Sequence, residues 1–325
     1  MANRIILHVG THKTGTTSLQ HFCRKNEKLL EQQNFYYPDY DIIGLKKAIA
    51  HHELSHAIAG KSEILTDRDV RRFIRSIKKI NGTVLISAEP FYRHFDDKTE
   101  GSIWEKKNRY IKKVASLFGK ETEICLVFRN QYNFAKSLYQ EIIKTDNLTS
   151  NFEEFLDSRA DWFDYFKNYQ LWKNHFNAIH TLSFEKLVKS NGVERSFLEY
   201  FNLNSEGLLT VQKQNDSLPF DLIEVKRNIN RLNLERNTLL RIRNLMAESI
   251  KDPNSLNIDL EKYEWIENSS INDFISKFDE GNRSLAKINP DLLTITELRK
   301  ETSKIYPGLD SSKLLALLKY YFNIV

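Results

Sequence analysis

The residues best suited to chemistry are a lysine, a glycine and several hydroxyls in the segment Gly10–Ser18, which reads GTHKTGTTS. The apolar run from Ile5 to Val9 predicts a buried strand before it, and Thr16 to about Gln33 predicts a helix after it. A loop between a strand and a helix directs backbone N–H groups and the positive end of the helix dipole at an anion, and glycine permits close approach. The segment therefore predicts a phosphate-binding loop.

The position of the lysine distinguishes this loop from the loop of nucleotide kinases and GTPases. Their pattern, GxxxxGK[ST], places the lysine directly after the second glycine and follows it with a Ser or Thr that binds magnesium. Here Thr16 follows Gly15, and Lys13 lies two residues before Gly15. We therefore expect the ammonium to approach from the loop side, toward the bond between a bound 5'-phosphate and the group being transferred.

The stretch from His8 to Gln20, HVGTHKTGTTSLQ, closely resembles the 5'-phosphosulfate-binding motif of sulfotransferases that use 3'-phosphoadenosine 5'-phosphosulfate (PAPS), most strongly that of bacterial members. The resemblance implies a sulfotransferase with a nucleotide-kinase-like fold, which uses PAPS as sulfuryl donor, releases adenosine 3',5'-bisphosphate and needs no metal. It also implies that Lys13 contacts the bridging oxygen of the phosphosulfate. The residues that it implies around the 5'-phosphate are Thr14, Gly15, Thr16, Thr17 and Ser18.

A second motif matches the 3'-phosphate site of that family, which has an arginine at a strand end and a serine eight positions later. The run Glu123–Phe128 predicts a buried strand, and Arg129 and Ser137 follow it with that spacing. A guanidinium and a hydroxyl suit a dianionic phosphate. Asn215 and Ser217 belong to an Asn-x-Ser-Leu segment similar to one in bacterial members, and they are expected as further nucleotide contacts.

A general base is expected beyond the strand Thr83–Ser87. Glu89 follows that strand at the carboxyl edge of the sheet, where ligands bind in open parallel α/β folds, and it can take the proton from an attacking hydroxyl or amine. In related sulfotransferases a Glu or His near the corresponding strand end serves as the base. A solvated or helix-capping glutamate is the other interpretation. His8, His12 and His52 are lesser candidates for the same role.

The acceptor implied by the resemblance to bacterial and carbohydrate sulfotransferases is a glycan or a lipid-linked saccharide. His12, His52 and Tyr139 are the residues expected to contact it. A small alcohol, a lipid or a peptide stays open as the acceptor. So does a protein that binds adenosine bisphosphate or a sulfated glycan without turnover, although Lys13 and Glu89 would then have no evident purpose.

The segment His52-Glu53-Leu54-Ser55-His56 fits the HExxH pattern, which puts two zinc-binding imidazoles and a general base on one helical face. Taken alone, it predicts a zinc metallopeptidase. We give this alternative less weight because no convincing third ligand follows. A zinc site would also leave the two anion motifs unexplained.

The elements that position these residues alternate between strands and helices, which predicts an α/β fold with a central parallel sheet and helices on both faces. The strands are expected at Ile5–Val9, Thr83–Ser87, Glu123–Phe128 and Ile179–Phe184. We expect residues 1–218 to form this core. Residues 219–325 are expected to form a mostly helical portion packed on it.

The composition excludes several classes of protein. The chain has 325 residues, 41% of them hydrophobic, which is enough for a large core. Lys and Arg outnumber Asp and Glu by 48 to 43, an excess that suits anionic ligands but, without a long basic run, does not indicate nucleic acid. Cys23 and Cys125 are expected as reduced core thiols of a cytoplasmic protein. We expect no signal peptide and no membrane span, while peripheral membrane association and the oligomeric state stay open.

Overall fold

The structure, a computed structural model, describes residues 4–211, 218–250, 256–296 and 304–324. The chain divides into two compact units, and each is described by itself. The sheet unit comprises Met1–Asn130, Asp161–Gln214 and Phe278–Glu297. The helical unit comprises Gln131–Ala160, Asn215–Lys277 and Leu298–Val325.

The described part of the sheet unit contains one five-stranded sheet with the strand order β2-β3-β1-β4-β5, in which every pairing is parallel. The strands are β1 (Arg4–His8), β2 (Phe35–Tyr36), β3 (Thr83–Ser87), β4 (Glu123–Phe128) and β5 (Ile179–Ser183). Ile6 of β1 lies opposite Leu85 of β3 on one side and Glu123 of β4 on the other. Because parallel strands end at the same edge, the segments that follow β1, β3 and β4 meet there.

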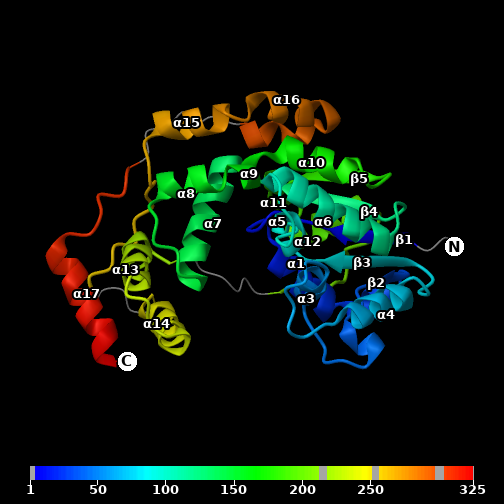
Figure 1. The fold of residues 1–325 in the computed structure, drawn as a ribbon, viewed down its shortest axis with the longest axis horizontal. Coiled ribbons are helices and arrows are strands. Elements are labelled where there is room, and N and C mark those ends of the chain that lie inside the picture. The colour runs from blue at the N-terminus through cyan, green and yellow to red at the C-terminus, as the bar shows by residue number, and fades with distance from the viewer. Residues whose placement is uncertain (1–3, 212–217, 251–255, 297–303, 325) are drawn as a thin grey trace. The chain divides into compact units, whose positions relative to one another are not determined.

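Helices cover both faces of this sheet (Figure 1). In chain order they are α1 (Thr16–Lys25), α2 (Glu27–Glu31), the 3₁₀ helix η1 (Tyr40–Ile43), α3 (His52–Ile58), α4 (Asp67–Ile77), α5 (Pro90–Arg93), α6 (Ile103–Phe118), α9 (Ala160–Phe163, at the division between units), α10 (Tyr165–Lys173), α11 (Phe184–Ser190), α12 (Val193–Tyr200), α16 (Asp279–Ile288) and the 3₁₀ helix η3 (Pro290–Thr296). Val127 of β4 packs in one core cluster with Phe22 of α1 and Phe197 of α12. The next residue, Phe128, points the other way and stacks on Tyr165 of α10, with ring centroids 4.6 Å apart. Both faces are therefore apolar, which explains the uninterrupted hydrophobic runs of the strands.

The helical unit consists of α7 (Gln131–Thr145), α8 (Phe152–Ser158), α13 (Phe220–Asn230), α14 (Arg236–Ser249), α15 (Asn268–Ser276) and α17 (Ser311–Ile324). Its core is aromatic. The ring of Trp265 lies 5.3 Å from that of Tyr139 on α7 and 4.5 Å from that of Phe220 on α13, measured between centroids. Large rings pack these helices together without a sheet.

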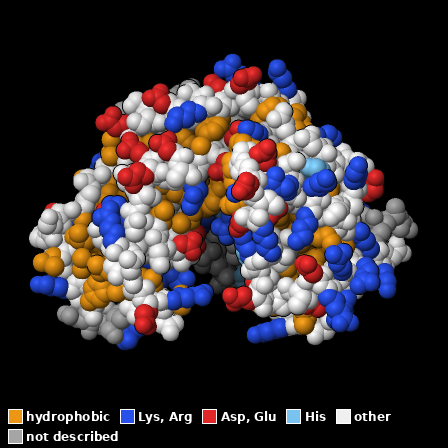
Figure 2. Space-filling view, in the orientation of Figure 1, with side chains coloured by type: hydrophobic (Ala, Val, Ile, Leu, Met, Phe, Trp, Pro, Cys, Tyr) orange, Lys and Arg blue, Asp and Glu red, His pale blue; other side chains and the backbone are white. Residues whose placement is uncertain are grey.

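The expected α/β fold with a central parallel sheet and a helical C-terminal region is confirmed. The compact units do not follow the expected division at residue 218, because α7 and α8 group with the later helices. Residues Phe278–Glu297 group with the sheet instead. No helix among the described residues is long and apolar enough to cross a membrane. On the face shown in Figure 2, Lys and Arg side chains are interspersed with Asp and Glu, in keeping with the small net charge of +5.

Candidate functional site

The predicted phosphate loop connects β1 to α1, and β4 holds it in place. The backbone N–H of Thr11 donates to the carbonyl of Val127 over 3.3 Å, and its hydroxyl donates to the same oxygen over 3.0 Å. Lys13 and Gly15 both have left-handed backbone conformations, with φ of 64° and 75°. Arg129 secures the first of these, because its Nη1 donates to the carbonyl oxygen of Lys13 over 2.9 Å. The two anion motifs of the sequence are thus joined by a hydrogen bond.

The hydroxyls of the loop differ in what they contact. Thr14 is buried, and its hydroxyl donates to the carbonyl of Thr11 over 2.6 Å and lies 3.4 Å from the hydroxyl of Thr16. Thr17 is exposed, whereas Ser18 donates to the carboxylate of Glu194. Thr14 and Ser18 therefore already have acceptors within the protein, which leaves the backbone N–H groups as the donors best placed for an anion.

The start of α1 is open to such a ligand. Gly15 is its N-cap, no side chain of the described residues caps the first turn, and that turn holds no acidic residue. By contrast, α4 begins with a capping box in which Thr66 and Asp69 use each other's backbone N–H groups. The first N–H groups of a helix need an acceptor, and an anion supplies it.

Glu89 occupies the end of β3 next to this loop and is 5% exposed. Its Oε2 accepts a hydrogen bond from Nε2 of His52 over 2.5 Å and lies 3.4 Å from the side-chain nitrogen of Gln20 on α1. The side chain of His52 is 42% exposed, so the imidazole is the member of the pair that solvent and ligands can reach. The structure thus brings Glu89 and His52 together as a hydrogen-bonded pair.

The preceding residue, His51, explains how His52 reaches Glu89. Nδ1 of His51 accepts the backbone N–H of Ser87 over 3.1 Å, and Nε2 lies 2.7 Å from the carbonyl oxygen of Pro38, to which it donates. Burial above all lowers the pKa of His51 to about 4 and keeps it neutral. This fixed imidazole ties the first turn of α3 to the end of β3, and sequence reasoning did not identify it.

The electrostatics of the pair favour an ionised carboxylate. Burial raises the pKa of Glu89, but the hydrogen bond and the charge of His52 outweigh it and lower that pKa to about 2. Burial, followed by the charge of Arg93, lowers the pKa of His12 to about 3, so His12 is neutral at physiological pH. Nε2 of His12 is buried and has no hydrogen-bond partner within the described ranges. A buried nitrogen of this kind is suited to contact a bound molecule.

Arg93 on α5 is a residue of this region that sequence reasoning missed. The pKa of His12 responds to the charges of Arg93, Glu89, His52 and Lys13, so these groups gather around one imidazole. Arg93 lies four residues after Glu89 in the short helix that follows β3. Its closeness to the end of that strand is the one feature of the sequence that could have indicated a role in the site. With His12 itself, the cluster combines four cationic or imidazole groups with one buried carboxylate.

The HExxH pattern does not assemble a metal site. His52 contacts Glu89, whereas Nδ1 of His56 lies 2.9 Å from Nε2 of His94. The carboxylate of Glu53 accepts a hydrogen bond from the hydroxyl of Ser62 over 2.7 Å. No group of three or more His, Cys, Asp or Glu side chains within the described part of the chain is arranged to hold a metal ion. The zinc metallopeptidase alternative is therefore not favoured.

The remaining expected residues are placed as follows. Arg129 belongs to the sheet unit, and its guanidinium carbon lies 5.1 Å from the ring centroid of Phe184. Ser137 is half-buried on α7 of the helical unit, so its pairing with Arg129 stays a prediction. Asn215 and Ser217 lie outside the described residues. Tyr139 is 1% exposed, and its hydroxyl donates to the carbonyl of Ser150 over 3.1 Å, which indicates a packing role.

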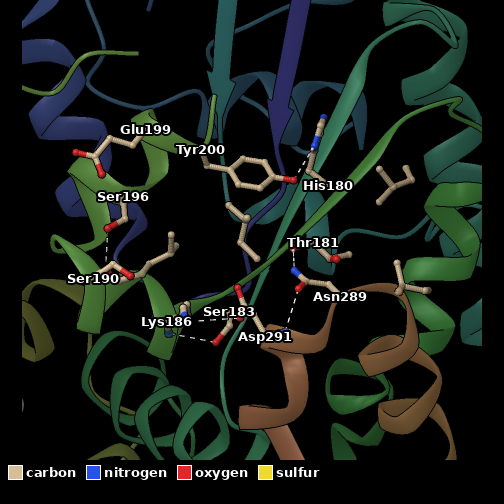
Figure 3. Close-up of a pocket in the computed structure, with 14 residues that line it drawn as sticks. His180, Thr181, Ser183, Lys186, Ser190, Ser196, Glu199, Tyr200, Asn289 and Asp291 are labelled. Atoms are coloured by element: carbon tan, nitrogen blue, oxygen red, sulfur yellow. Dashed lines mark hydrogen bonds and ion pairs between the residues drawn. The ribbon is translucent and has the colours of Figure 1, made fainter. Parts of the chain in front are cut away.

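A cavity of about 530 Å³ lies beside β5, the edge strand of the sheet, and Figure 3 shows residues that line it. Several of its polar side chains already have partners within the protein: the hydroxyl of Tyr200 lies 3.1 Å from Nδ1 of His180, and the amide of Asn289 donates to the backbone carbonyl of Thr181 over 2.6 Å. No residue of Gly10–Ser18 lines it. The candidate site is therefore the loop and the end of β3, not this cavity.

Comparisons with known proteins leave the family unassigned. No family model matches the chain, and no curated protein matches it. Among solved structures, the chain is similar to a sulfotransferase from Alicyclobacillus acidocaldarius with 13% sequence identity and a TM-score of 0.41, over 74% of this chain and 100% of that one. The function is accordingly inferred from the residues of the site.

Proposed function

We propose that this protein is a sulfotransferase that moves a sulfuryl group from PAPS to a hydroxyl or amine of an acceptor. The observation that carries the proposal is the loop Gly10–Ser18, with Lys13 before Gly15, next to the hydrogen-bonded pair of Glu89 and His52. The loop suits a phosphate, and the pair suits an acceptor that loses a proton. A protein that only binds phosphate would not need the hydrogen-bonded pair of Glu89 and His52.

The donor would bind through groups that the loop and the end of β4 present. The open N–H groups of α1 suit the 5'-phosphate, and the buried Thr14 hydroxyl shapes the loop. Thr14, Gly15, Thr16, Thr17 and Ser18 are assigned to this phosphate on the strength of the sequence motif. Arg129 is assigned to the 3'-phosphate, together with Ser137 on the strength of the sequence motif. Asn215 and Ser217 are assigned to the nucleotide on the same ground.

In the transfer, an acceptor oxygen or nitrogen attacks the sulfur while the bond from sulfur to the bridging phosphate oxygen breaks. Adenosine 3',5'-bisphosphate leaves with the electrons of that bond, and the ammonium of Lys13 stabilises the negative charge on it. Electrostatic stabilisation of this kind supplies about 3 to 4 kcal/mol in a site shielded from water. The step requires no metal.

The proton of the acceptor goes to the pair of Glu89 and His52. We expected Glu89 itself to take it, but this carboxylate is buried and its Oε2 already accepts the hydrogen bond from Nε2 of His52. The half-exposed imidazole of His52 is better placed, because its Nε2 donates to Glu89 and its Nδ1 has no hydrogen-bond partner among the described residues. Glu89 would orient the ring and stabilise the imidazolium, as a carboxylate does in other His–carboxylate pairs.

A glycan or a lipid-linked saccharide is the proposed acceptor, and it rests on the sequence resemblance. His12 supports a polar acceptor, since its unpartnered Nε2 can contact a hydroxyl. His52 is the other residue that we assign to acceptor contact.

The test is a screen of acceptors with radiolabelled PAPS, run on the unaltered chain and on Lys13→Met. We expect label to appear on a saccharide with the unaltered protein and to fall by about a hundredfold or more with Lys13→Met. Lys28→Met removes the same charge from an exposed position on α2 and should leave transfer unchanged. Donor binding without transfer to any acceptor would show a binding protein instead. Absence of PAPS binding would overturn the proposal.

A further inference from the structure

The helical unit contains a cavity of about 400 Å³ with an excess of positive charge. It is lined by the end of α7, by the residues that follow it, and by α13 and α14. The charged groups of its lining are Lys144, Asp146, Lys226, Arg236 and Arg243. Four cations thus face one carboxylate, and none of these residues belongs to the site of the proposed function.

The buried member of this group, Lys226, is held in position by the protein. It is 2% exposed, and its ammonium donates to the side-chain oxygen of Asn230. The amide nitrogen of Asn230 in turn donates to the carbonyl oxygens of Ile143, Asp146 and Leu148, over 3.2, 3.2 and 2.9 Å. The ammonium is therefore held in place through Asn230 by residues 143–148, and it does not extend into solvent.

The positive charges of the cavity are only partly compensated. Lys144 has a carboxylate partner, since its ammonium lies 3.1 Å from Glu141. For Lys226, Arg236 and Arg243, the described residues supply no carboxylate within ion-pair distance. The pKa of Lys226 is lowered to about 8, chiefly by burial and then by the charge of Arg243. The carboxylate of Asp146 opposes this lowering only in part. Of these three cations, Lys226 is buried, Arg243 is half-buried and Arg236 is exposed. A buried cation is normally paired, so an anion next to Lys226 would relieve the excess of positive charge.

We propose that this cavity binds a compact oxyanion of the phosphate or sulfate type, either free or carried on a sugar. Guanidinium groups such as those of Arg236 and Arg243 form paired hydrogen bonds with these anions, and a fixed ammonium adds a point charge. The volume of about 400 Å³ is enough for the anion together with a sugar ring. The proposal does not depend on the proposed function, because that function uses none of the residues that line this cavity.

Calorimetry on the full chain tests the proposal with three probes: inorganic phosphate, glucose 6-phosphate and glucose. Arg243→Ala should weaken binding of the phosphorylated probes by about tenfold or more, the usual loss for a charge-assisted contact. Arg241→Ala removes the same charge from the same helix outside the cavity lining, and it should change binding by less than about twofold. Circular dichroism would establish that both variants are folded.

The loop also binds phosphate by the proposed function, so Lys13→Met is included to separate the two sites. Binding that survives in Lys13→Met and is lost in Arg243→Ala belongs to the cavity. Equal affinity for inorganic phosphate and glucose 6-phosphate would identify a free anion, and tighter binding of the sugar phosphate would identify a carried group. If Arg243→Ala and Arg241→Ala bind as the unaltered chain does, or if glucose binds as tightly as glucose 6-phosphate, the proposal is wrong.

Discussion

Replacing Glu89 with glutamine tests the chemical half of the proposed function. The carboxylate of Glu89 accepts the Nε2–H of His52 over 2.5 Å and is 5% exposed. Glutamine has nearly the same size and keeps one oxygen for that hydrogen bond, but it carries no negative charge. The substitution therefore removes the charge that orients His52 and stabilises its protonated form, and it should leave the surrounding packing intact.

The expected magnitudes differ for catalysis and for donor binding. Loss of a general base or of its charged partner lowers turnover by about a hundredfold or more, which corresponds to about 2.7 kcal/mol in the barrier. Donor affinity should change by less than about threefold, because the Glu89 carboxylate makes its hydrogen bonds with His52 and Gln20, and neither residue belongs to the phosphate loop. Removing a negative charge near Lys13 can only strengthen the attraction of an anion.

The assay combines transfer of label from radiolabelled PAPS with calorimetry of adenosine 3',5'-bisphosphate on the same preparation. His52→Gln should show the same pattern, and the double variant should lose little more turnover than either single variant, because residues that act as a unit are not additive. Turnover that survives in Glu89→Gln would refute the role of the pair. A collapse of bisphosphate affinity would show instead that Glu89 organises the nucleotide site.

Three further predictions concern the donor site and stability. Arg129→Ala should weaken adenosine 3',5'-bisphosphate by about tenfold or more in calorimetry but hardly affect AMP; equal losses would mean that Arg129 acts through the loop carbonyl that it holds. Gly15→Ala should lower the free energy of unfolding in urea by at least about 1 kcal/mol more than Gly44→Ala. Both residues have a φ near 75°, but a Cβ on Gly15 would lie 2.9 Å from Val193 and one on Gly44 would contact nothing, so equal losses would exclude the steric contribution. Because the folded pKa of Glu89, about 2, is below its ordinary value of 4.5, this group stabilises the fold above pH 4.5 and loses that effect as the pH falls toward 2. Between pH 4.5 and pH 2, the free energy of unfolding of the unaltered chain should therefore fall by up to about 3 kcal/mol more than that of Glu89→Gln, as measured by urea unfolding at each pH. If the free energies of the two proteins fall in parallel, the low pKa of Glu89 is contradicted.

Much of the sheet could be predicted from the sequence because its strands are buried on both faces. The expected strands Thr83–Ser87 and Glu123–Phe128 match β3 and β4 at both ends. Strand β1 begins and ends one residue earlier than expected, and β5 ends one residue earlier. Strand β2 was not predicted, since its two residues, Phe35 and Tyr36, are too short to show any periodicity. The grouping of α7 with the late helices was not predicted either, because it depends on aromatic contacts between segments far apart in the chain.

Some residues of the candidate site could likewise be predicted from the local sequence, whereas others depend on contacts between distant segments. The loop and Glu89 could be predicted because each directly follows a strand, and parallel strands end at one edge. The contact between His52 and Glu89 could not, because it depends on His51, whose ring binds the backbone of Ser87 from 36 positions away. A pattern of HExxH spacing carries no information about such a partner. The position of His52 in the folded chain, rather than the motif, therefore decides between a zinc ligand and a partner of Glu89.

The backbone at Lys13 gives a reason to connect the loop with chemistry at its side chain. A left-handed conformation costs a residue other than glycine about 1 to 2 kcal/mol, and glycine would adopt the φ of 64° without strain. The surrounding structure holds this conformation, because Arg129 donates to the Lys13 carbonyl and β4 binds Thr11. A lysine at a position that suits glycine is best explained by a need for its ammonium at the loop. Strained residues of this kind gather at functional sites, and here the strain coincides with the group that the proposed transfer places on the leaving phosphate.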